Sequence, residues 1–353
     1  MRPGTLRRRS RAQTSQRAIV DRQATDLVRQ VCDLAGARDL IANLRGDLDA
    51  QGILGALEAH DTPTIYNWMV RNIAYQGISD YVAHDFMDRH GSVTWSQIEQ
   101  SLGDEPTCPK LGSYWRFHRC GYDKTRRTCK QPDHFLACPL PAHPLRNGRL
   151  NQSAYSLYLF MRDIADCDFV GWLTSSLGSA HCQPHDVDRI RQALIDRLQY
   201  LFGLSSKMLT MIFSDLLIGG ASGRPAWLEV GAGMIVVDTL VHNFLARTGI
   251  LHRHQANHLY GPHCYGANGC ADLIRRIASR IDGRQFNPAF PKTFPRFVQH
   301  AIWRYCSQQG LDICNGNRIN DRLRCANAWC PVVARCDRKL LRQLQRKPIE
   351  PSQ

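Results

Sequence analysis

The sequence predicts an all-α fold, built as a two-lobed helical bundle. Apolar residues recur at three- and four-residue steps along most of the chain, which is the spacing of one buried helix face. Segments that alternate between apolar and polar residues, as half-buried strands do, are almost absent. The length of 353 residues is enough for two lobes with cores of their own.

The composition favours an intracellular protein with a polyanionic partner. The formal net charge of +14 favours nucleic acid first and an acidic membrane surface second, and the alternative is a solvated basic surface. No run of about 18 or more apolar residues occurs, so we expect no membrane span. The basic N-terminus lacks the apolar segment of a secretory signal, so we expect a cytoplasmic or otherwise intracellular location. Fourteen cysteines in such a protein indicate metal ligation rather than disulfides.

The chain begins with a basic segment and continues into helices. Residues 1–24 show no sustained periodicity, which predicts a flexible arm that contacts phosphates or a disordered start without a role. Helical spacing then covers residues 25–103. We expect a loop between two helices at Gln76-Gly77, because glycine weakens a helix. A glutamine at this place either projects into a groove or caps a helix end.

Residues 104–149 form a cysteine-rich insertion with many Pro, Gly and basic residues. Cys108, Cys120, Cys129 and Cys138 are separated by eleven, eight and eight residues, which is wider than the paired spacing of a zinc finger. Two interpretations stay open. The four cysteines bind a metal ion, with Zn²⁺ as the expected metal, or they are buried free thiols.

Residues 150–305 return to helical spacing and carry the two side chains that look most functional. Near residues 195–218, the tight polar turn Gly203-Leu204-Ser205-Ser206 precedes a helix that begins close to Lys207. The apolar run Met234-Ile235-Val236-Val237 is followed by Asp238, which precedes another expected helix. A lysine at a helix start and an aspartate after an apolar run suggest two groups that face a shared cleft.

Two further segments lie near these side chains. A Gly-rich loop is expected between Gly219 and Gly233, and a helix over residues 239–247. Beyond this helix lies a loop that contains six potential metal ligands. This loop is either a further metal site or, as the favoured interpretation, a polar loop with two structural thiols. The six residues are His252, His254, His258, His263, Cys264 and Cys270.

Residues 306–345 are expected to form a metal-cluster loop. Its cysteines, Cys314, Cys325, Cys330 and Cys336, follow the pattern C-x10-C-x4-C-x5-C. Four cysteines in a compact loop suit a [4Fe–4S] cluster or zinc. Cys306 is a fifth candidate, but it lies inside the preceding helical pattern. The surrounding basic residues would make the loop a phosphate-binding surface. They are Arg318, Arg322, Arg324, Arg335, Arg338 and Lys339.

Four of these segments together resemble the helix-hairpin-helix (HhH-GPD) DNA glycosylases of the endonuclease III type. The segment Leu201-Phe202-Gly203-Leu204-Ser205-Ser206-Lys207 is similar to that family's hairpin, L-P-G-V-G-x-K. Val237-Asp238-Thr239-Leu240-Val241 followed by Arg247 is similar to its V-D-T-H-V segment. The Gly310-x3-Cys314 loop is similar to its iron–sulfur loop, and Tyr75-Gln76-Gly77-Ile78-Ser79 to the segment whose glutamine fills the gap in the DNA stack. The resemblance covers roughly residues 60–100 and 150–340.

The resemblance implies a base excision repair enzyme that flips a damaged or modified base out of double-stranded DNA and excises it. Lys207 would attack C1′ and form a Schiff base, which adds AP lyase activity, and Asp238 would stabilise positive charge on the sugar. Gln76, Gly203, Ser205 and Ser206 would contact DNA. The implied cofactor is a [4Fe–4S] cluster on Cys314, Cys325, Cys330 and Cys336. We expect a monomer, associated with the nucleoid in a bacterial-type cell.

The sequence also departs from the family pattern. Ser205 replaces the second glycine of the hairpin and Phe202 its proline. Lys207 and Asp238 are 31 positions apart, and the first two gaps of the cluster loop are wider than in the family. The alternatives are therefore a non-catalytic DNA-binding protein on a glycosylase scaffold and, less favoured, an iron–sulfur electron-transfer protein.

Overall fold

The computed structural model describes residues 3–78, 80–131, 136, 138–178 and 187–341. The chain divides into two units by the density of its internal contacts. Unit 1 consists of Met1–Ile41 and Ala232–Gln353, and unit 2 consists of Ala42–Gly231.

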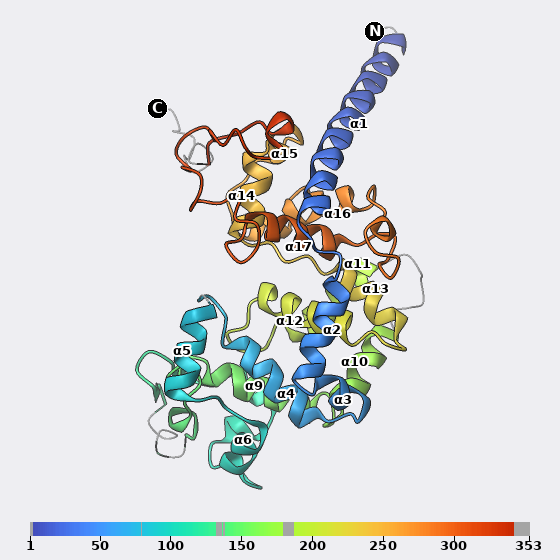
Figure 1. The fold of residues 1–353 in the computed structure, drawn as a ribbon. Coiled ribbons are helices and arrows are strands. Elements are labelled where there is room, and N and C mark those ends of the chain that lie inside the picture. The colour runs from blue at the N-terminus through green and yellow to red at the C-terminus, as the bar shows by residue number, and fades with distance from the viewer. Residues whose placement is uncertain (1–2, 79, 132–135, 137, 179–186, 342–353) are drawn as a thin grey trace. The chain divides into compact units, whose positions relative to one another are not determined.

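Unit 1 is a helical bundle in which α1, α14 and α16 all pack against α17 (Figure 1). The second half of α1 contributes Leu27, Val28 and Val31 to the core, and α17 contributes Phe297 and Ile302. The elements of this unit are α1 (Pro3–Leu34), α14 (Thr239–Arg247), α15 (Ile250–Arg253), η3 (Pro262–Tyr265), α16 (Cys270–Ala278), η4 (Gly283–Gln285), α17 (Pro295–Cys306) and η5 (Val333–Arg335), where η denotes a 3-10 helix.

Unit 2 is a second helical bundle, with α4, α6 and α9 in mutual contact. Tyr66 of α4 packs edge-on against Trp95 of α6 and Tyr158 of α9, and its hydroxyl donates to the Ala154 carbonyl at 3.0 Å. The elements lying wholly or mostly in this unit are α2 (Leu40–Ala50), α3 (Ile53–Glu58), α4 (Thr62–Ile73), α5 (Asp80–His90), α6 (Trp95–Leu102), η1 (Pro109–Gly112), α7 (Tyr114–Phe117), β1 (Tyr122–Asp123), β2 (Thr128–Cys129), η2 (Leu140–Ala142), α9 (Asn151–Asp163), α10 (Phe169–Gly178), α11 (Val187–Leu198), α12 (Ser206–Gly219) and α13 (Pro225–Gly233).

The all-α prediction is confirmed, since the described residues are mostly helical. The strands among these residues are β1 and β2, which pair antiparallel over two residues each inside the cysteine-rich insertion. The break at Gln76-Gly77 is also confirmed, because α4 ends at Ile73 and α5 begins at Asp80. Every helix of the described residues is too short or too polar to traverse a lipid bilayer.

Two segments differ from the sequence expectation. Residues 3–24 belong to α1, where the sequence showed no sustained periodicity. Arg, Ala and Gln favour helix without needing an apolar face. The expected Gly219–Gly233 loop contains α13, whose first residue is Pro225. Proline suits the first turn of a helix, since its missing N–H would have no partner there. Pro225 in this Gly-rich stretch therefore indicates the start of a helix.

Candidate functional site

The turn before α12 presents Lys207 in the first turn of that helix. Gly203 takes a φ of 68°, a left-handed conformation that favours glycine. Ser205 is the N-cap, and its hydroxyl accepts a hydrogen bond from the Met208 N–H at 3.2 Å. Lys207 is half-buried. The sequence therefore placed both the start of this helix and its lysine correctly.

Gln76 contacts this turn at two points. Its Nε2 donates to the Gly203 carbonyl, and its Oε1 accepts a hydrogen bond from the Ser205 N–H at 3.2 Å. The Gln76 carbonyl in turn accepts a hydrogen bond from the Arg146 guanidinium at 2.5 Å. The structure thus brings Gln76, Gly203 and Ser205 together, and the Gln76 side chain binds the turn rather than projecting into a groove. Ser79, at the end of the same segment, lies outside the described residues.

The cysteine-rich insertion packs on the other residues of the turn. Phe117 of α7 meets Phe202 edge to face, with ring centroids 5.4 Å apart. His118 stacks on Phe202 with a centroid distance of 6.4 Å. Through these rings and through Arg146, residues 104–149 support the segment that carries Lys207.

The four cysteines of the insertion lie near one another. Burial raises the pKa of Cys120, with smaller contributions from Cys129 and Cys108. Burial and the other three cysteines together raise the pKa of Cys138 to about 11. The N–H of Gln131 donates to the Cys129 sulfur at 3.4 Å, and backbone N–H groups two residues after Cys120 and Cys138 also donate to their sulfurs. Such hydrogen bonds stabilise thiolate ligands of a metal. The metal of Cys108, Cys120, Cys129 and Cys138 stays a prediction.

Asp238 is the N-cap of α14. The buried segment Met234–Val237 leads to it, and its Oδ1 accepts a hydrogen bond from the Val241 N–H at 2.9 Å. The Asp238 side chain is half-exposed. Asp238 belongs to unit 1 and Lys207 to unit 2. The shared cleft expected from the sequence therefore stays a prediction.

Four ligand-bearing side chains converge in unit 1, next to Asp238. They are His242, His258, Cys264 and Cys270, whose ligand atoms all lie within 4.8 Å of one another. His242 Nδ1 is 3.4 Å from the Cys270 sulfur and 3.6 Å from the Cys264 sulfur, and His258 Nε2 is 3.4 Å from the Cys270 sulfur. Three of the four residues are buried and His258 is half-buried. This group could hold a metal ion.

The two thiols of this group share a proton. The hydrogen bond from Cys270 lowers the pKa of the Cys264 thiol below its ordinary value, and hydrogen bonds from His242 and His258 add to this effect. The same hydrogen bond, together with burial, raises the pKa of the Cys270 thiol. One member of the pair is therefore easily ionised, as a metal ligand must be.

The sequence identified three of these four ligands. His258, Cys264 and Cys270 belong to the loop that it marked, whereas His242 lies inside an apolar helix pattern and was missed. The other marked histidines do not join the group. His254 bonds the Asp21 carboxylate at 3.0 Å, while His252 and His263 are exposed. The interpretation favoured from the sequence was a polar loop with two structural thiols. It did not predict that residues of this loop meet His242 of α14.

The C-terminal cysteines gather around Arg247 of α14. Arg247 is 2% exposed, and it pairs with Asp321 and donates to the Cys314 sulfur at 3.6 Å. The Cys336 thiol donates to the Arg247 carbonyl at 3.7 Å, and Cys336 in turn accepts from the Arg338 N–H at 3.4 Å. The hydrogen bond from Cys306 lowers the pKa of the Cys314 thiol, and the buried Arg247 guanidinium lowers it further.

The rest of this set lies close by. The Cys330 sulfur is 3.1 Å from the Tyr305 hydroxyl. Burial raises the pKa of Cys336 to about 11, with further contributions from Cys314, Cys330 and Cys325. The iron–sulfur cluster expected on these cysteines stays a prediction. Cys306 lies at the end of α17, where the sequence placed it, and makes a side-chain hydrogen bond with Cys314.

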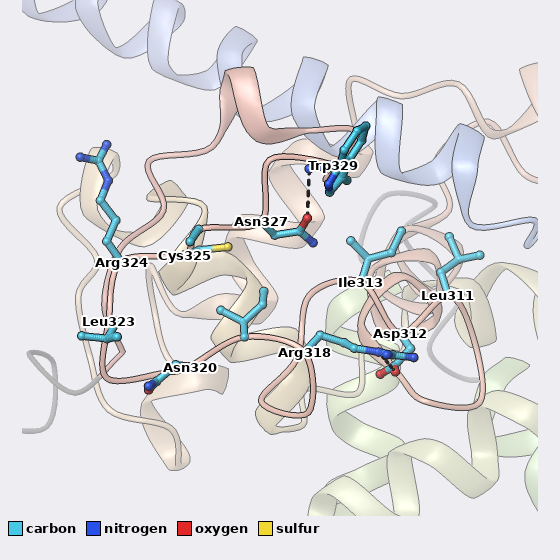
Figure 2. A pocket seen from close by; sticks show the side chains of 12 residues that line it. Leu311, Asp312, Ile313, Arg318, Asn320, Leu323, Arg324, Cys325, Asn327 and Trp329 are labelled. Atoms are coloured by element: carbon cyan, nitrogen blue, oxygen red, sulfur yellow. Dashed lines mark hydrogen bonds and ion pairs between the residues drawn. The ribbon is translucent and has the colours of Figure 1, made fainter.

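A pocket of about 650 Å³ opens on this cysteine loop (Figure 2). Cys325, Arg324 and Trp329 line it, and Arg318 pairs with Asp312 at 2.5 Å in its wall. Trp329 is 95% exposed, and its backbone N–H donates a hydrogen bond to Asn327 Oδ1 at 3.1 Å. An exposed aromatic ring among arginines is a surface that suits stacked bases and phosphates.

Comparisons with known proteins add no family to this picture. No family model matches the chain, and no match was found among curated proteins or solved structures.

Proposed function

We propose that the protein is a DNA glycosylase that flips out and excises a damaged or modified base and then cleaves the strand as an AP lyase. The observation that carries this proposal is the setting of Lys207. Its amine lies in the first turn of a capped helix, directly after a glycine turn that Gln76 holds by two hydrogen bonds. This is the local arrangement that the resemblance to endonuclease III-type enzymes requires.

The proposed chemistry uses Lys207 as the nucleophile. Its neutral Nζ attacks C1′ of the flipped nucleotide, and the base departs with the electron pair of the N-glycosidic bond and takes up a proton. Ring opening of the sugar gives a Schiff base between Nζ and C1′. Loss of a C2′ proton then breaks the C3′–O bond by β-elimination, and water releases the lysine.

Asp238 is proposed to serve the same reaction. Positive charge develops on the sugar as the glycosidic bond breaks, and an ionised carboxylate nearby stabilises that charge. Asp238 is half-exposed and uses its Oδ1 to cap α14, so one oxygen remains for substrate.

DNA binding is supported by three features of the described residues. The N–H groups at the start of α12 point along the helix axis, and such groups bind phosphate. Arg324 and Trp329 flank the pocket of Figure 2. The net charge of +14 would draw the protein to a duplex and make binding fall with salt.

The two cysteine sets supply the thiolate ligands that the expected cofactors need. Cys314, Cys325, Cys330 and Cys336 would hold a [4Fe–4S] cluster, which would fasten the C-terminal loop to Arg247. Cys108, Cys120, Cys129 and Cys138 would hold Zn²⁺ or another thiolate-bound metal in the insertion. Both groups serve structure in this proposal, and no step of the reaction passes through them.

The test is borohydride trapping on a panel of duplexes that carry uracil, oxidised pyrimidines, 8-oxoguanine, or deaminated or alkylated purines. Borohydride reduces the Schiff base to a stable protein–DNA adduct. We expect an adduct with the parent protein on at least one lesion and none with Lys207→Gln. Lys124→Gln, at an exposed lysine of the insertion, is the matched control and should trap like the parent.

Each alternative outcome has a clear meaning. An adduct that persists in Lys207→Gln removes Lys207 from the nucleophile role. Tight binding without excision on every lesion, in single and double strands, identifies a non-catalytic DNA-binding protein instead.

A further inference from the structure

The four-residue group of His242, His258, Cys264 and Cys270 has the dimensions of a tetrahedral zinc site. Zinc binds sulfur at about 2.3 Å and imidazole nitrogen at about 2.0–2.1 Å, so tetrahedral geometry sets neighbouring sulfur and nitrogen ligands about 3.6 Å apart. Three of the four nitrogen–sulfur distances in this group are 3.4, 3.6 and 3.4 Å. Two sulfur atoms also converge on the single atom His242 Nδ1, which has at most one proton to donate.

The protonation state of His258 fits a metal ligand. Its Nδ1 lies 2.7 Å from the Ala256 carbonyl, so this nitrogen carries the proton and donates it. In the neutral ring the other nitrogen, Nε2, then presents its lone pair to the centre of the group. A backbone carbonyl that fixes the tautomer of a ligating histidine is a common feature of metal sites.

The two sulfur ligands are placed by tight backbone geometry. Cys270 is the first residue of α16. Gly269 precedes it, and a Cβ at that position would lie 2.2 Å from the His263 carbonyl oxygen and 2.8 Å from that of Cys264. Only glycine allows the chain to turn so closely that Cys270 comes beside Cys264.

The same loop is bonded to the residue before Asp238. The Tyr265 hydroxyl, next to Cys264 in the chain, donates to the Val237 carbonyl at 3.1 Å and accepts from the Val237 N–H at 3.1 Å. His242 follows Asp238 by one helical turn, and its N–H donates to the Asp238 carbonyl at 3.0 Å. The loop of this group therefore contacts the residue before Asp238, and His242 lies one helical turn after Asp238.

We propose that His242, His258, Cys264 and Cys270 bind one zinc ion, and that this site clamps the Gly261–Tyr265 turn onto Val237 and thereby positions Asp238. The ion needs no open coordination position in this role, since four protein ligands complete a structural zinc site. Tyr265 is a positioning residue, because it acts on Asp238 only through the Val237 backbone. This inference goes beyond the proposed function and would hold for any activity of Asp238.

The metal is tested on the purified full chain by elemental analysis and by cobalt substitution. We expect Cys270→Ser and His258→Asn each to lose about one equivalent of zinc per chain relative to the parent. His263→Asn is the matched control, because this exposed histidine lies in the same loop outside the group. Cobalt(II) in the parent should give the intense visible bands of a tetrahedral site with thiolate charge transfer.

The result that overturns the site is an unchanged zinc content in both variants. Where one of the two variants does not fold, the zinc content of the other decides. A zinc content equal to that of His263→Asn means that the four residues form a hydrogen-bonded network without metal.

The positioning role is tested by amide hydrogen exchange, which needs no DNA. Tyr265→Phe should retain the zinc and speed exchange of the Val237 amide by about fivefold, the effect of losing one ordinary hydrogen bond. Removal of zinc by chelation should speed the same amide, while amides in the middle of α17 stay protected. Exchange of Val237 that is indifferent to zinc would refute the clamp. Because neither readout involves excision, failure of the glycosylase proposal leaves this result intact, and the reverse also holds.

Discussion

Phe117 and Phe202 meet edge to face, with ring centroids 5.4 Å apart and ring planes at 78°. Phe117 belongs to the cysteine-rich insertion, and Phe202 belongs to the turn that carries Lys207. The hairpin of the resembling family has a proline where Phe202 stands. The contact therefore joins the cysteine-rich insertion to the segment that carries Lys207.

Replacement of Phe117 by alanine is expected to destabilise unit 2 strongly. Phe117 is 1% exposed, and loss of a buried phenylalanine side chain costs about 3–5 kcal/mol. Trp115, two residues earlier in α7 and 64% exposed, is the matched control, and Trp115→Ala should cost about 1 kcal/mol or less. Urea denaturation followed by circular dichroism measures both. Equal shifts of the midpoint in the two variants would contradict the supporting role of Phe117.

The sequence predicts the parts of this protein that depend on local signals. The positions of α14 and α12 follow from an apolar run, a capping Asp238 or Ser205, and helical spacing, all of which lie within a few residues. The helical content follows in the same way. The loop between α4 and α5 follows from Gly77, because glycine weakens a helix.

What the sequence did not predict depends on contacts between distant segments. His242 occupies a buried helix position that could equally hold an apolar residue, and only the packing of α16 and η3 near α14 turns it into a ligand. The contact between Phe117 and Phe202 likewise joins residues far apart in the chain. No periodic pattern carries such information, because periodicity reports which face is buried and not what it is buried against.

Asp238→Asn should separate the two roles of this residue. Asparagine caps a helix about as well as aspartate, so the thermal midpoint should stay close to that of the parent. The amide has no charge to stabilise a cationic sugar, so excision should fall by about a hundredfold or more. Asp238→Ala should lower both, with about 1 kcal/mol of stability lost with the cap. Turnover by Asp238→Asn at the parent rate would assign this residue to capping alone.

Removal of Cys314 and of Cys306 should have different effects on iron. Cys314 is one of the three cysteines whose charges raise the pKa of Cys336, whereas Cys306 makes a hydrogen bond to Cys314 from the end of α17. We expect the parent to be brown, with the visible absorption of a cysteine-ligated [4Fe–4S] cluster. Cys314→Ala should lose that absorption, and Cys306→Ala should keep it. Loss of iron in both variants would make Cys306 a ligand, and a colourless parent that contains zinc would rule out the cluster.

His300 should make the protein less stable as the pH falls. Burial in α17, with help from Arg296 and Arg304, lowers the pKa of His300 to about 3, whereas an unfolded chain protonates histidine near its ordinary value of about 6.5. The neutral ring is therefore favoured in the folded state, and its contribution is complete above about pH 6.5 and is lost as the pH falls towards about 3. Between pH 7 and pH 5 the loss should be about 1–2 kcal/mol, since part of the ring contacts solvent. His300→Gln should show a shallower fall in unfolding free energy over this range, measured by urea titrations at each pH, with His263→Gln at an exposed histidine as the control. Parallel curves for the parent and His300→Gln would show that His300 does not drive the acid sensitivity.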